Sequence, residues 1–394
     1  MKTVKHAPPL FSEPEKNSRA PRAGRYPAGM WMPVILTCCA LFAGCKRNAA
    51  DSPPVAKADA LPPTKPDISE KVAKPAPIPT PTPIPTPMPA AGTREWYEEA
   101  AARGDATAQA RLGVIYSEGS GGVAKDEAKA AEWFRKAAEN GNADAQCSLG
   151  MNYALGSGVP RDEAKAAEWL QKSADQGNAA AQFSLALMVA GGAGVPRDDA
   201  KAADLFAKAA AQGNTVAQFN IGVMHATGKG VARDDAKAVG WYAKSAAQGY
   251  APAEANLGGM YAEGLGVEKN EVKAVEWFQM AAVQGHAVAQ FNLAIRYAGG
   301  LGISKDEEKA AEWLQKSALQ GYPAAQFNLG VMHANGISGP KDFVRAHVWY
   351  SLAARQNDPD AVAELAALSA RMTAAQKEEA QKAMAELQVK MPGR

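Results

Sequence analysis

The segment from Asn142 to Gly177, NADAQCSLGMNYALGSGVPRDEAKAAEWLQKSADQG, decides the fold of this chain. Its first half places Ala145 and Leu149 at helical spacing, which predicts an amphipathic helix. Gly156 follows, and glycine ends helices because it adopts the left-handed conformation without a steric cost. Asp162 then stands where a helix N-cap belongs, and the residues after it predict a second helix. The segment is therefore a helix–turn–helix unit.

One aromatic position repeats through the chain at a constant interval of 36 residues. The seven positions are Trp133, Trp169, Leu205, Trp241, Trp277, Trp313 and Trp349. A fixed period of this size predicts a stack of units, none of which can bury its apolar face alone. We interpret the tryptophans as core side chains that fill the gap between neighbouring units.

Other positions recur with the same period and predict where each helix begins and ends. The predicted N-caps of the second helices are Asp126, Asp162, Asp198, Asp234, Asn270, Asp306 and Asp342. The predicted glycine ends of these helices are Gly141, Gly177, Gly213, Gly249, Gly285 and Gly321. A small residue inside each first helix predicts a close helix contact, and the row is Gly113, Gly150, Ala186, Gly222, Gly258, Ala294 and Gly330.

The whole pattern, A-x-A-Q-x-x-L-G-x-x-Y-x-x-G-x-G-V-x-x-D-x-x-K-A-x-x-W, resembles the Sel1-like repeat, a relative of the tetratricopeptide repeat. The resemblance covers seven units between residues 105 and 357, with Leu205 and Glu254 departing from the pattern. It implies an all-α, right-handed α/α superhelical solenoid over residues 93–357. Residues 93–103 resemble the second helix of an incomplete unit, and residues 358–394 are predicted to form C-terminal capping helices with a polar outer surface.

Residues 1–44 have the pattern of an export signal. A basic stretch precedes the apolar run MWMPVILTCCALFAG, which is shorter than the roughly 20 residues of a membrane span. The ending Phe42-Ala43-Gly44-Cys45 resembles a bacterial lipobox, which implies lipidation at Cys45. An ordinary signal peptide with a coincidental cysteine, or a start codon placed too early, remains the alternative. We expect an exported protein of the cell envelope, anchored by lipid and favouring the periplasmic face of the outer membrane.

Residues 45–92 are predicted to be a proline-rich tether. Thirteen prolines lie between Pro53 and Pro89, and proline fixes φ and removes the amide donor. Extended polyproline II rises about 3.1 Å per residue, so such a tether spans roughly 100 Å or more. A proline-rich recognition motif is the competing interpretation.

The charge balance argues against nucleic acid as a partner. The chain holds 43 basic and 41 acidic residues, and no basic block lies in the repeats. Cys147 is the one cysteine expected to keep a free thiol once Cys38 and Cys39 leave with the signal and Cys45 is lipidated. It shares its repeat position with phenylalanines, which predicts a buried side chain.

Motifs for catalysis are scarce. His225 and His333 share one repeat position but are three repeats apart, so they are not expected to bind one metal, and we expect no metal and no cofactor. Cysteine-rich members of the resembled family are associated with β-lactam binding or hydrolysis, but this chain lacks their paired cysteines. Its single Ser-x-x-Lys, from Ser338 to Lys341, has no partner motif.

One polar row is the candidate binding site. Asn220, Asn256, Asn292 and Asn328 precede the Leu-Gly position of four successive first helices. This position resembles the asparagine with which the concave face of tetratricopeptide-like solenoids holds a bound peptide, and an amide matches the donors and acceptors of peptide backbone. Hydrogen bonds to neighbouring helices or to solvent are the alternative role. We predict a monomeric, non-catalytic scaffold for a protein or peptide partner; the alternative function is a cell-wall-directed enzyme or β-lactam-binding protein.

Overall fold

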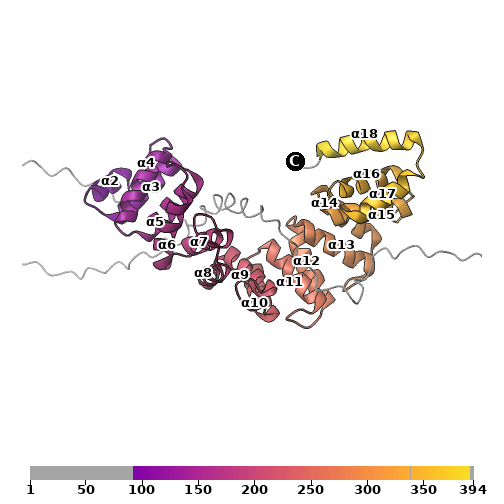
Figure 1. Ribbon diagram of the computed structural model, residues 1–394, viewed down its shortest axis with the longest axis horizontal. Coiled ribbons are helices and arrows are strands. Elements are labelled where there is room, and N and C mark those ends of the chain that lie inside the picture. Colours follow the sequence, from indigo (N-terminus) through magenta and orange to yellow (C-terminus); the bar gives the residue numbers. More distant parts are fainter. Residues whose placement is uncertain (1–91, 338, 391–394) are drawn as a thin grey trace, which may run out of the picture. The chain divides into compact units, whose positions relative to one another are not determined.

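The computed structural model describes residues 92–337 and 339–390, and all regular secondary structure in these two ranges is α-helical (Figure 1). The helices are α2 (Arg94–Ala102), α3 (Ala106–Glu118), α4 (Glu127–Glu139), α5 (Ala143–Leu155), α6 (Glu163–Asp175), α7 (Ala179–Gly191), α8 (Asp199–Ala211), α9 (Thr215–Thr227), α10 (Asp235–Ala246), α11 (Ala251–Glu263), α12 (Glu271–Val283), α13 (Ala287–Gly299), α14 (Glu307–Leu319), α15 (Pro323–Asn335), α16 (Phe343–Ala354), α17 (Pro359–Ser369) and α18 (Ala374–Lys390). Odd-numbered helices from α3 to α15 are the first helices of the repeats, and the even-numbered helices that follow them are the second.

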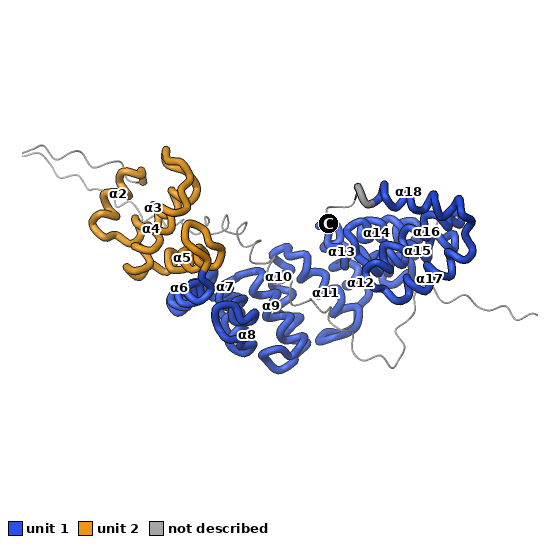
Figure 2. Tube along the Cα trace, turned by 45° about the horizontal axis from the view of Figure 1, so that its top comes forward, with its two compact units in different colours: residues 1–25, 162–394 blue, residues 26–161 orange. Residues whose placement is uncertain are grey.

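The described residues fall into two compact units, 92–161 and 162–390 (Figure 2). Within each unit, successive helices from α2 to α5 and from α6 to α17 pack against one another, and α18 packs against α16, as an all-α solenoid requires. No helix in the described ranges combines the length and the apolar composition needed to cross a membrane. The predicted signal, Cys45 and the proline-rich tether lie outside the described residues.

The predicted helix boundaries are confirmed. All seven predicted N-cap residues accept a hydrogen bond from the backbone three residues later, as Asp162 does from the Lys165 amide at 3.0 Å. The predicted end glycines have φ between +77° and +90°, as Gly177 does at +88°. Each boundary is therefore fixed by a side chain or a glycine within the same turn, which is why the sequence alone reveals it.

In four repeats the small residue of the first helix is a glycine that receives an aromatic ring from the second helix of the same repeat. A Cβ added at Gly258 would lie 2.8 Å from Cδ1 of Phe278, and one at Gly330 would lie 2.4 Å from Cδ1 of Tyr350. Both rings are almost fully buried. The close helix contact predicted from this row is confirmed at these four glycines, and Tyr350 and Phe278 are among the largest core side chains.

The tryptophans are less buried than predicted. Trp349 is 5% exposed, but the other five are only half-buried, because the residue that follows each tryptophan faces the core instead. The residues that follow the six tryptophans are Phe134, Leu170, Tyr242, Phe278, Leu314 and Tyr350, and Phe206 follows Leu205 at the same repeat position. Trp277 and Trp313 do pack along one side against the core of the preceding repeat. The tryptophans thus border the core rather than fill it.

A lysine covers the exposed side of four of these rings. The Lys172 Nζ lies 3.9 Å from the Trp169 ring centroid, and the Lys244 Nζ lies 4.1 Å from that of Trp241. Lys136 and Lys316 make the same contact with Trp133 and Trp313. A cation over the face of an indole is attracted by the ring quadrupole, so each lysine shields apolar surface while its ammonium group stays in water.

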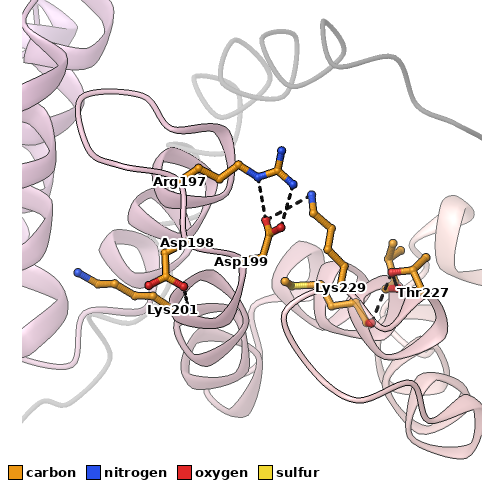
Figure 3. Close-up of polar contacts among 8 residues, drawn as sticks. Arg197, Asp198, Asp199, Lys201, Thr227 and Lys229 are labelled. Carbon is orange, nitrogen blue, oxygen red and sulfur yellow. Dashed lines mark hydrogen bonds and ion pairs between the residues drawn. The ribbon is translucent and has the colours of Figure 1, made fainter.

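In five repeats a turn glycine contacts the backbone of the repeat before it. Gly230, in the turn after α9, has φ +73°, and a Cβ there would lie 2.1 Å from the carbonyl oxygen of Asp199 at the start of α8. Beside this contact, Arg197 donates to the Asp199 carboxylate at 2.8 and 3.2 Å, and the Lys229 Nζ lies 3.5 Å from Asp199 Oδ1 (Figure 3). The Arg197 hydrogen bonds and the Lys229 charge hold the pKa of Asp199 below its ordinary value.

The two ends of the described chain carry the predicted capping elements. α2 forms over the segment predicted as a lone second helix, and its Ala100 and Ala101 are buried with Leu112 of α3. At the other end, α18 lies against α16 (Figure 1) and buries Ala380. Cys147 is 5% exposed, as its repeat position predicted.

Candidate functional site

The four asparagines of the candidate site occupy one position on successive first helices of the 162–390 unit. Asn220 lies on α9, Asn256 on α11, Asn292 on α13 and Asn328 on α15. Each side chain is half-buried, and each directly precedes a buried aliphatic residue of the core. The core therefore fixes the rotation of each helix, and this rotation leaves the amides at the edge of the buried surface.

Three of the four amides are hydrogen-bonded to their own helix. Nδ2 of Asn220 donates to the Val216 carbonyl at 2.8 Å, and Nδ2 of Asn328 donates to the Ala324 carbonyl at 2.8 Å. Asn292 makes the same bond at 3.0 Å. Each bond uses one of the two amide hydrogens, so Oδ1 and the second hydrogen stay available as an acceptor and a donor. Among the described residues, no hydrogen-bond partner of Asn256 is found.

A buried glutamine row, whose role our sequence interpretation missed, binds the repeats together. Nε2 of Gln290 donates to the Ala282 carbonyl of the preceding repeat at 3.1 Å, and its Oε1 accepts from Gln320 Nε2 at 2.8 Å. The same bond to the preceding second helix is made by Gln109, Gln146, Gln182, Gln218 and Gln326. The signal was present in the sequence, since six of the seven repeats have a glutamine at the same position beside buried alanines.

Glu254 takes the glutamine position in one repeat, and it is fully buried. Its Oε2 accepts a hydrogen bond from Gln284 Nε2 at 2.8 Å, as the glutamine oxygens do. Its Oε1 replaces the donating nitrogen and is buried without a hydrogen-bond partner. Burial raises the pKa of this carboxyl above its ordinary value, and the Gln284 hydrogen bond opposes only part of that effect.

The described residues offer little for metal-dependent or nucleophilic chemistry. They contain no group of three histidine, cysteine or acidic side chains close enough to hold a metal ion. His225 lies on α9 and His333 on α15, and burial lowers the pKa of His333, which favours its neutral form. Ser338 is outside the described residues. Nothing in the described ranges favours the cell-wall enzyme or β-lactam alternative.

Comparison with known protein families matches the Sel1 repeat in eight segments, which are 93–105, 106–142, 143–178, 179–214, 215–250, 251–286, 287–322 and 323–358. These segments cover more than half of the chain. The chain belongs to the Sel1 repeat family. Sel1 repeats are related to tetratricopeptide repeats, and proteins built from them generally mediate protein–protein interactions. The short first segment corresponds to the incomplete unit at α2.

Solved structures of Sel1 repeat proteins resemble the chain. A Sel1 repeat protein from Oxalobacter formigenes is 35% identical, with a TM-score of 0.56, over 70% of this chain and 79% of that one. The protective antigen c5321 of uropathogenic Escherichia coli is 32% identical, with a TM-score of 0.37, over 76% of this chain and 79% of that one. A search of curated proteins found no match.

Proposed function

We propose that this Sel1 repeat protein is a non-catalytic adaptor that binds an extended segment of a partner protein along its first helices. The observation that carries the proposal is the row of four half-exposed amides, one in each repeat from α9 to α15. Each amide keeps an acceptor and a donor for a ligand, which suits the alternating groups of peptide backbone. Because the core fixes the helices that carry these amides, little conformational entropy is lost on binding.

The asparagine row is tested by site-specific photocrosslinking in the native cell envelope. A photoreactive amino acid at position 256 is expected to capture a partner, and mass spectrometry then gives the captured segment. Placed at Lys208, an exposed side chain on the second helix α8, the same probe is expected to capture none of it. The double variant Asn256→Ala/Asn292→Ala should weaken binding of that segment by about tenfold or more.

The same double variant separates binding from folding. Neither asparagine is fully buried. The thermal unfolding midpoint of the double variant is therefore expected to stay within a few degrees of that of the parent protein. Unchanged affinity for the captured segment, at an unchanged midpoint, would show that the asparagines do not form the binding surface.

We also propose that the adaptor is tethered to a membrane by lipid at Cys45 and held away from it by residues 45–92. The basic stretch, the short apolar run and the cysteine that follows it support this proposal. In cells supplied with radioactive palmitate, the parent protein is expected to incorporate the label and sediment with membranes. The Cys45→Ala variant is expected to lose both properties, and a labelled Cys45→Ala protein would contradict lipidation at this residue.

A further inference from the structure

Large apolar side chains are exposed on one helix far more than elsewhere in the described chain. Six such side chains are exposed, and five belong to α12 or to the segments next to it. The five are Val272 (55% exposed), Met280 (44%), Val283 (64%), Val288 (39%) and Leu301 (41%). The sixth, Val362, lies on α17. Isolated exposed hydrophobic residues are ordinary, but a cluster of them marks an interaction surface.

The sequence of α12 explains this cluster. Val272, Glu276, Met280 and Val283 share one face, because they are spaced at i, i+4, i+8 and i+11 of a helix. In α4 the same face carries Lys136 and Glu139 at the positions of Met280 and Val283. The change to Met280 also removes the lysine that covers the tryptophan in four other repeats. We call Val272, Glu276, Met280 and Val283 the α12 face.

The corresponding face of α16, two repeats later, is covered by a helix. Val344, Val348 and Leu352 stand 72 residues after Val272, Glu276 and Met280. Val348 is 4% exposed and Leu352 is 7% exposed, although the corresponding positions on earlier second helices are exposed. The difference is the neighbouring α18, which packs against α16 (Figures 1 and 2).

Helix α18 shows what kind of helix can pack on this face of a second helix. The side chains of α18 in the shared apolar cluster are Ala380, Ala383, Met384 and Leu387. Their spacing of three and four residues forms one narrow apolar stripe, and two of the four are alanines that permit close approach of the two helices. The α12 face has apolar residues at the positions of Val344 and Leu352. It has Glu276 in place of Val348 and Val283 in place of Arg355.

Charge then distinguishes the occupant of α12 from α18. Glu276 is exposed at the middle of the face, and Glu308 and Glu312 hold the positions of Val272 and Glu276 one repeat later. An acidic side chain in a docking surface favours a lysine or arginine on the partner, because a charge desolvated without a counter-charge is costly. A partner helix with basic residues beside its apolar stripe satisfies both requirements.

We propose that the α12 face is a docking site for a basic amphipathic α-helix of a partner protein, which covers it as α18 covers α16. This surface belongs to the second helices, whereas the asparagine row belongs to the first. The chain therefore carries two binding surfaces, and the α12 site does not depend on the proposed asparagine site.

The test uses full-length protein and a defined probe. The probe is a fluorescein-labelled synthetic helix of 18 residues, with alanine and leucine on one stripe and lysine elsewhere, and its binding is measured by fluorescence anisotropy. The variant Met280→Lys/Val283→Glu restores the residues that α4 carries at these positions, so we expect it to fold. It should bind the probe at least about tenfold more weakly, and Val362→Glu, which alters the exposed valine of α17, should bind it like the parent protein.

A charge exchange makes the test specific. A second probe with glutamate in place of lysine is expected to bind the parent protein weakly and the Glu276→Lys variant more tightly. Circular dichroism confirms that each variant is folded, and Val272→Glu replaces the Met280→Lys/Val283→Glu variant if that variant is not folded.

Three outcomes overturn the proposal. The first is equal binding of the lysine probe by the parent protein and by the Met280→Lys/Val283→Glu variant. The second is a concentration-dependent dimer in sedimentation velocity that this variant abolishes, which would assign the face to a second copy of the chain. The third is binding to neutral phosphatidylcholine vesicles that the variant abolishes, which would assign it to lipid.

Discussion

Gly266→Ala is expected to lower the free energy of unfolding by about 3 kcal/mol or more, the largest effect of any single substitution considered for this Sel1 repeat protein. Gly266 has φ +67°, and a Cβ there would lie 2.3 Å from the carbonyl carbon of Asp235 and 2.6 Å from the amide nitrogen of Ala236. These are backbone atoms at the start of α10, which a rotamer change cannot move. The substitution must therefore separate two repeats or distort the turn.

Gly285→Ala is the matched control. Gly285 also has a left-handed backbone, at φ +90°, but a Cβ there would meet no atom within 4 Å. Its cost is the left-handed conformation alone, about 1–2 kcal/mol. Urea unfolding followed by circular dichroism measures both variants. Equal losses would mean that the turn glycine contributes only its conformation and not the contact between repeats.

Glu254→Gln is expected to raise the free energy of unfolding by about 1–3 kcal/mol at pH 7, because it supplies a donor where a buried oxygen has no partner. The substitution restores the residue that the other six repeats carry, and the new Nε2 can donate to the Ala246 carbonyl as Gln290 does to Ala282. Gln284 keeps its acceptor in the variant. Few single substitutions of a buried side chain are expected to stabilise a protein, which makes the sign of this effect informative.

The stabilities of the parent protein and of the Glu254→Gln variant should depend differently on pH, because the pKa of Glu254 is raised in the folded parent. The folded parent protein holds the Glu254 proton to a higher pH than the unfolded chain, whose carboxyl has its ordinary pKa of 4.5. The folded state therefore binds more protons, and its stability falls as the pH rises above 4.5. The difference in urea midpoint between Glu254→Gln and the parent should be large at pH 7 and narrow towards pH 4. A difference that is constant over this range would contradict a raised pKa of Glu254 in the folded protein.

The helix boundaries could be predicted because each depends on residues a few positions away. Asp162 and Gly177 cap or end a helix by local backbone geometry, so no knowledge of the tertiary structure was needed. The burial of Trp169 could not be predicted in this way, because it depends on how the helix is rotated against its neighbours. Trp169 and Leu170 are adjacent on the helix surface, about 100° apart, and a small rotation of the helix decides which of them is buried. The tryptophan position and the position after it both recur every 36 residues, so the period does not show which of the two is buried.

The candidate sites differ in the same way. The asparagine row could be recognised in the sequence because its members recur. The hydrogen bonds of these side chains to their own helices could not be predicted and are seen only in the structure. The glutamine row recurs as plainly as the asparagines, and its role follows from burial of a polar amide. The α12 face has no periodic signal. Met280 and Val283 are single departures from the pattern, and they gain meaning only when the structure shows that nothing among the described residues covers them.

The contact between the turn glycine and the preceding repeat has a consequence for how such a chain changes length during evolution. Every contact of this kind joins a residue to a partner about 30 residues before it, so a deletion or duplication of one whole period brings equivalent groups together at the new boundary. Deletion of residues 251–286 would place Gln290 opposite Ala246. The Ala246 carbonyl could then accept the hydrogen bond that Gln290 donates to Ala282 in the full chain. That period holds both Glu254 and the α12 face. Removal of residues 251–286 would therefore shorten the chain without breaking the contacts between repeats, and it would remove both of these features.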